Sequence, residues 1–101
     1  MRCEEFVNFY LPAIRALLAR ELVSKYRMTQ SETARKMYLT QAAVAYYLNE
    51  SRGKNIRAIE RKKEIKGMIS HLAKEIFSRN LRKIELEKKY CEICKVLFKN
   101  L

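Results

Sequence analysis

The chain has few of the residues that turn a backbone sharply or build a catalytic centre. Its 101 residues include two glycines, one proline, one histidine and no tryptophan. Because Gly and Pro are the strongest breaks in regular structure, their scarcity favours long helices with short connections. With one histidine, no acid and base pair in a cleft-forming pattern and no Gly-rich phosphate loop, the sequence predicts neither an enzyme nor a small-molecule substrate.

Long apolar runs are also missing. No stretch approaches the roughly 18 apolar residues of a membrane span, and the first five residues lack the basic-then-apolar order of a signal peptide. We therefore expect a cytoplasmic protein with no membrane partner. Apolar residues still make up 49% of the chain, which at this length supports one compact domain.

Acidic residues are outnumbered by basic ones. The chain has 22 Lys and Arg against 11 Asp and Glu, a formal net charge of +11. The excess is uneven, since residues 1–51 contain 7 basic and 5 acidic residues, whereas residues 52–101 contain 15 and 6. A charge of this size favours a polyanionic partner, and nucleic acid is the first candidate.

The spacing of apolar residues predicts an all-α fold of about five helices. The first extends from Glu4 to Tyr26, with a start or kink near Pro12. Beyond a loop at residues 49–54, apolar residues recur at helical spacing and predict two more helices with a weak break near Asn80. The predicted regions are a helix-turn-helix region at 1–54 and a C-terminal helical region at 55–101, within one compact domain.

Residues 29–48 predict the helix-turn-helix. Thr29, with Glu32 three residues later, forms a capping box for a helix that ends near Met37. Thr40 caps the next helix, which ends near Leu48, so the link is only about three residues long. Ala34 is the small residue where the two helices touch.

The second of these helices suits the major groove of DNA. Gln41 can present its amide to adenine, and Ala42 and Ala45 can contact a thymine methyl. The predicted DNA-binding residues, including those directed to phosphate, are Gln30, Thr40, Gln41, Ala42, Ala45, Tyr46, Arg52, Lys54 and Arg57.

Residues 30–48 resemble the helix-turn-helix of the Cro and lambda repressor (XRE-like) class. A wider similarity, which includes residues 11–15, 42–49 and 52–53 and the terminal Cys91-Glu-Ile-Cys94, is to short archaeal transcriptional regulators of that class. The chain departs from the motif at Tyr38, which stands where glycine is usual and would be strained if the backbone there requires a positive φ.

The three cysteines leave several alternatives open. Cys91 and Cys94 are three residues apart, so on a helix they share one face, and Cys3 could join them only if the chain ends meet. Three thiolates suit an iron-sulfur cluster, whereas structural zinc needs a fourth ligand, such as His71 or a partner's thiol. Cys91 and Cys94 could equally be small buried apolar residues, and a redox pair is a third option for which the helical spacing is awkward. The resemblance favours metal binding or redox sensing.

The sequence thus predicts a transcriptional regulator that binds double-stranded DNA as a homodimer. The C-terminal helices are the expected dimer element, since Ile65, Ile69, Leu72 and Ile76 form a stripe suited to a core or a dimer seam. The alternative is a basic helical module that binds nucleic acid or protein without sequence specificity. His71, beside this stripe, is expected to be half-buried and paired with a neighbour.

Overall fold

The computed structural model describes residue 4, residues 6–49 and residues 54–99, and the regular structure within them is entirely helical. A short π-helix, η1 (Phe6–Tyr10), precedes six α-helices: α2 (Leu11–Ser24), α3 (Gln30–Met37), α4 (Gln41–Asn49), α5 (Lys54–Glu60), α6 (Lys63–Ser78) and α7 (Lys83–Phe98). The predicted all-α fold is confirmed. None of these described helices is both long and apolar enough to cross a membrane.

Pro12 sets the start of the first regular α-helix. Proline has no amide hydrogen, and its ring crowds the carbonyl four residues earlier, so it fits only the first turn of an α-helix. The residues before it, Phe6–Tyr10, wind as a π-helix, and α2 begins at Leu11 with Pro12 in its first turn. The structure confirms the predicted start or kink near Pro12.

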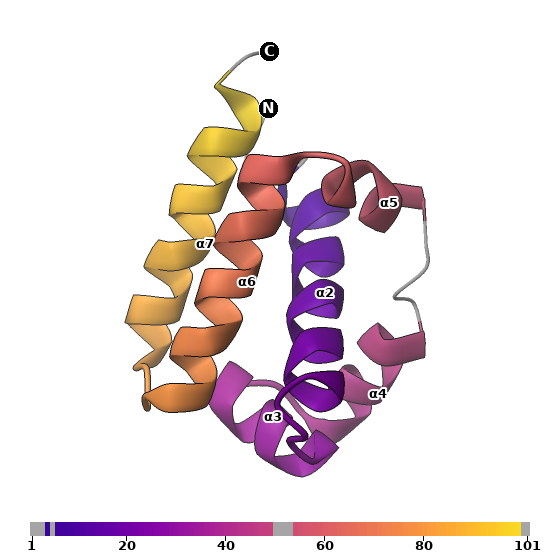
Figure 1. Cartoon of the computed structure of the whole chain (residues 1–101), viewed down its shortest axis with the longest axis vertical. Helices are drawn as coiled ribbons and strands as arrows, with labels where there is room; N and C mark the ends of the chain where they lie inside the picture. Colours follow the sequence, from indigo (N-terminus) through magenta and orange to yellow (C-terminus); the bar gives the residue numbers. More distant parts are fainter. Residues whose placement is uncertain (1–3, 5, 50–53, 100–101) are drawn as a thin grey trace.

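Helix α2 is the centre of the molecule. Figure 1 shows it between the paired helices α6 and α7 and the helices α4 and α5. Ile14, Leu18 and Leu22, spaced four residues apart along α2, are completely buried. Val44 of α4 and Ile59 of α5 are also completely buried in this cluster. The two predicted regions of the chain therefore contribute to the same hydrophobic core.

The C-terminal region has three helices where two were predicted. The break near Asn80 is present, between α6 and α7, but a second break separates α5 from α6 at Arg61 and Lys62. A continuous helix would place Lys62 or Lys63, three and four residues after the buried Ile59, on the apolar face. The chain instead extends at Lys62 (φ −91°, ψ 98°) and starts a new helix whose first buried residue is Ile65.

The apolar stripe of α6 is part of the core of the single chain. Its four members, Ile65, Ile69, Leu72 and Ile76, are buried without any second copy present. Burial of such side chains contributes roughly 1.5–3 kcal/mol each, so exposing them to form a dimer seam would be costly. Of the two predicted roles of this stripe, a core or a dimer seam, the structure supports the core.

Candidate nucleic-acid interface

The two helices of the predicted motif are separated by three residues, 38–40, as expected. Thr29 caps α3, because the amide of Glu32 donates to Thr29 Oγ1 at 3.0 Å. The second half of the capping box differs from the prediction: the Glu32 carboxylate accepts from the Thr29 hydroxyl at 3.1 Å, where a backbone amide was expected as donor. The cap fixes the start of α3 at Gln30.

A tight hydrogen-bonded turn ends α3. Tyr38 adopts the left-handed conformation (φ 58°, ψ 42°), and the amide of Leu39 donates to the carbonyl of Ala34 at 2.9 Å. The amide of Tyr38 donates to the carbonyl of Arg35 at 3.3 Å, which completes a Schellman-type helix end. Ala34 is buried at this turn, where a small residue was predicted.

Thr40 then caps α4, since the amide of Ala43 donates to Thr40 Oγ1 at 3.0 Å. The predicted cap is confirmed. In this bond Thr40 Oγ1 is the acceptor, so the hydroxyl hydrogen can still be donated to an outside acceptor such as phosphate. The same residue can therefore shape the turn and contact a ligand.

Helix α4 has one buried and one exposed side. Val44 is completely buried against α2, and Tyr47 and Leu48 are half-buried. Gln41 and Ala42 are exposed, and Tyr46 is 60% exposed. Ala45, predicted to face outward with them, is half-buried. The exposed side of α4 carries no charged residue. No carboxylate on it would therefore repel DNA electrostatically, and contacts to base edges would depend on hydrogen bonds and apolar packing.

The structure describes some, but not all, of the residues predicted to contact phosphate. Gln30 is exposed at the first position of α3, and Arg57 is exposed on α5. Lys54 is the first residue of α5, whereas Arg52 lies outside the described residues.

Arg27 is a basic residue beside the motif that was not among the predicted DNA-binding residues. Its side chain is exposed two residues before the Thr29 cap, and its backbone is left-handed (φ 58°). A basic residue so close to the capping threonine was the signal that could have pointed to it. A cation here would strengthen a phosphate contact made at the start of α3.

The turn between α3 and α4 is fastened to the end of the α6 and α7 pair. The Tyr38 hydroxyl donates a hydrogen bond to the carbonyl of Leu81. Lys36 Nζ donates to the carbonyls of Ile76 and Phe77 at 3.1 and 3.0 Å, and so caps the C-terminal end of α6. These contacts hold the motif in one orientation against the rest of the fold.

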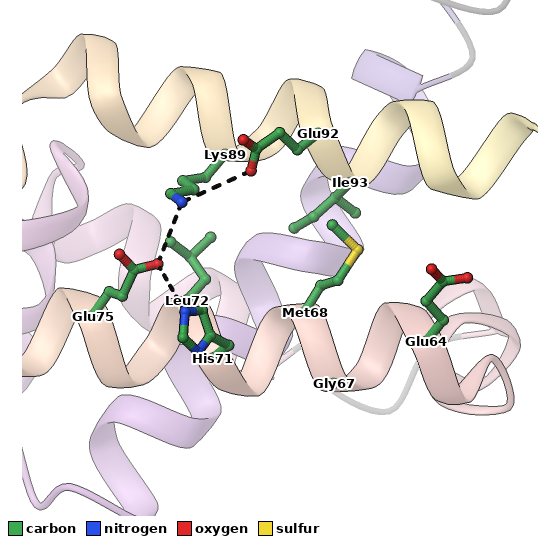
Figure 2. Close-up of a pocket in the computed structure, with 9 residues that line it drawn as sticks. All are labelled: Glu64, Gly67, Met68, His71, Leu72, Glu75, Lys89, Glu92 and Ile93. Carbon is green, nitrogen blue, oxygen red and sulfur yellow. Dashed lines mark ion pairs between the residues drawn. The ribbon is translucent and has the colours of Figure 1, made fainter.

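A pocket of about 350 Å³ lies between α6 and α7 (Figure 2). Its floor is apolar, and its rim carries an ion-pair network centred on Glu75. Glu75 Oε1 lies 3.7 Å from Lys89 Nζ and 3.5 Å from His71 Nε2, and Lys89 Nζ lies 3.8 Å from a carboxylate oxygen of Glu92. The Glu75 to Lys89 pair joins the two helices, so the structure supports a packing role for this cluster.

His71 differs from its predicted environment. It is paired with Glu75, as expected of a histidine satisfied by a neighbour, but its side chain is 72% exposed instead of half-buried. His71 is exposed because it comes one position before the buried Leu72, and this position lies on the solvent side of α6.

Two of the three cysteines lie within the described residues. Cys91 is exposed and Cys94 half-buried on α7, while Cys3 lies outside the described part of the chain. Over the described ranges, no group of three or more His, Cys, Asp and Glu side chains is arranged to hold a metal ion. Of the predicted ligand set of Cys3, Cys91 and Cys94, only Cys91 and Cys94 are therefore among the residues that the structure describes.

Comparison with known proteins gives no relative. No family model matches the chain, and no curated protein or solved structure matches it either. The function must therefore be argued from the residues and their geometry.

Proposed function

We propose that the protein is a transcriptional regulator of the cytoplasm that binds double-stranded DNA sequence-specifically through α4. One observation carries the proposal: two capped helices meet at a three-residue turn, and Val44 anchors α4 so that Gln41, Ala42 and Tyr46 remain exposed. A helix held in this way can enter the major groove. The resemblance of residues 30–48 to Cro-like and lambda-repressor-like motifs agrees with this proposal.

The exposed side chains suit recognition of bases. The Gln41 amide can pair with the N6 and N7 edge of adenine, and the Ala42 methyl, with part of Ala45, can pack against a thymine methyl. Tyr46 can reach a base edge or phosphate. Such contacts discriminate by about 1–3 kcal/mol per good bidentate pair.

Contacts to phosphate would supply most of the affinity. Gln30 and Thr40 stand at the starts of α3 and α4, where helix N-termini favour anions. Arg57, with Arg52 and Lys54 before it, adds positive charge after α4, and the net charge of +11 favours association with DNA throughout. Binding should weaken steeply as salt rises, because each phosphate contact releases condensed counterions.

We infer further that two copies act together. One α4 contacts only a few base pairs, whereas two copies about a two-fold axis read half-sites about 34 Å apart. Since the α6 stripe is buried in the core of each copy, the contact between copies must use a different surface.

Selection from a pool of random duplexes tests the proposal. The wild-type chain should enrich one motif with two-fold symmetry. Gln41→Ala should enrich a motif with one degenerate position per half-site. Asn8→Ala, which removes an exposed amide outside α4, is the matched control and should enrich the wild-type motif. A pool that stays random under wild-type selection would contradict sequence-specific binding and favour the alternative, a basic helical module without sequence specificity.

A further inference from the structure

A second cavity, of about 510 Å³, lies between η1, the start of α2 and α7. Its walls are mostly apolar and include Phe6, Val7, Leu11, Ile84, Cys91 and Cys94. Val7 and Ile84 are 56% and 50% exposed, unusually high values for large aliphatic residues next to a hollow. The volume lies within the roughly 300–1,000 Å³ typical of small-molecule sites.

Arg15 is a cation of the cavity that forms no ion pair with the described carboxylates. Arg15 of α2 lines it and is half-buried, with its guanidinium 5.7 Å from the centre of the Tyr90 ring. No carboxylate of the described residues lies within 4.0 Å of Arg15, whereas Arg20, on the same helix, lies 2.6 Å from Glu60. A partly desolvated guanidinium favours an anion beside it, with a carboxylate as its best-matched partner.

The other polar groups of the cavity agree with an anionic occupant. Lys88 adds a second positive charge, and Glu87 is the only carboxylate among the described residues that line the cavity. Tyr90 is neutral at physiological pH, since burial raises its pKa to about 12. Its phenol therefore brings no negative charge to the cavity.

We propose that this cavity binds a small apolar molecule that carries one carboxylate. The apolar part lies against Val7, Leu11 and Ile84, and the carboxylate pairs with the Arg15 guanidinium. The site is separate from α4, and the proposal does not depend on DNA binding.

Three probes that share an octyl-type alkyl group and differ in head-group charge test the proposal. They are octanoate, octanol and octylammonium, each used below the concentration at which it forms micelles. Amide chemical shifts in two-dimensional NMR report where each one binds. Octanoate should shift Val7, Ile84 and Cys91 in a saturable way, and the neutral and cationic probes should bind at least about tenfold more weakly, as expected for loss of a charge-assisted pair.

Two variants locate the charge that matters. Arg15→Gln should weaken octanoate binding by about tenfold or more, whereas Lys66→Gln, which removes an exposed cation outside the cavity, should leave it unchanged. Equal binding of the three probes, or octanoate shifts away from this cavity, would overturn the proposal. So would a dimer that Ile84→Glu converts to monomer in sedimentation, because a second copy would then cover the cavity. The probe comparison uses the unaltered chain and does not depend on how Arg15→Gln folds.

Discussion

Tyr38 offers the sharpest test of the turn that positions α4. The residue is left-handed, a conformation that costs an L-residue with a Cβ roughly 1–2 kcal/mol and that glycine adopts freely. At most helix positions alanine is more stabilising than glycine. At position 38 the order should reverse, so Tyr38→Gly should be more stable than Tyr38→Ala.

The magnitude follows from what the two variants share. Both lose the tyrosine ring and the hydrogen bond to the carbonyl of Leu81, so those losses cancel. The relief of left-handed strain favours glycine by about 1–2 kcal/mol, and the greater freedom of glycine in the unfolded chain offsets about 0.5–1 kcal/mol of it. The midpoints of the two ranges leave an expected difference of about 0.75 kcal/mol in favour of Tyr38→Gly.

A third variant isolates the hydrogen bond. Tyr38→Phe keeps the ring and the strain but removes the donor to Leu81, and should lower the free energy of unfolding by about 1 kcal/mol. Urea unfolding followed by far-UV circular dichroism measures all three variants, and 1 kcal/mol corresponds to roughly 4–8 °C in Tm for a domain of this size. If Tyr38→Ala equals or exceeds Tyr38→Gly in stability, residue 38 is not left-handed and the described turn is wrong.

Three further changes probe the fold. Gly67→Ala should raise the free energy of unfolding by about 0.8–1 kcal/mol, because Gly67 is inside α6 and a Cβ there meets no atom within 4 Å; no gain would contradict a regular helix at this position. Lys36→Met should lower it by about 1 kcal/mol through loss of the bonds that cap α6, and an unchanged urea midpoint would show that Lys36 does not reach that helix end. Tyr90 has a pKa raised from 10.0 to about 12 by burial, so the folded state keeps a proton that the unfolded chain loses between these values, and stability falls as pH rises through this window. Between pH 9 and 12, the free energy of unfolding of the wild type should therefore fall by a few kcal/mol more than that of Tyr90→Phe. If urea titrations show equal losses for the two proteins, the Tyr90 phenol is not buried.

Local patterns in the sequence predicted the motif well. Thr29 and Thr40 are short-range caps, and their hydrogen bonds to residues three positions later follow from the sequence alone. The inward position of Val44 follows from helical periodicity in the same way. These features depend on contacts within one turn of helix, so one sequence is sufficient to find them.

Features that depend on distant contacts could not be predicted. Tyr38 is the residue at which the sequence departs from the usual motif. The hydrogen bond that offsets its left-handed strain is made to the carbonyl of Leu81, 43 residues later in the chain. The cap that Lys36 provides for α6 is similarly remote. Spacing showed that the α6 stripe is apolar, but only the packing of α6 on α2 shows that the same chain buries it.

The candidate site was predicted more completely for α4 than for its surroundings. Gln41, Ala42 and Tyr46 are exposed as expected, while Ala45 is partly covered because it lies next to Val44 on the side that packs. Arg27 could have been included on its position two residues before the Thr29 cap, but its left-handed backbone could not be predicted from the sequence.

The most direct test of the central claim compares two variants on the motif obtained by selection. Fluorescence anisotropy over a range of salt concentrations gives the ratio of affinities for that motif and for a scrambled duplex. Gln41→Ala should lower this ratio about tenfold or more, whereas Arg57→Gln should weaken both duplexes alike and reduce the dependence of binding on salt by about one phosphate contact. If Arg57→Gln changes the ratio and Gln41→Ala leaves it unchanged, α4 is not the helix that reads the bases.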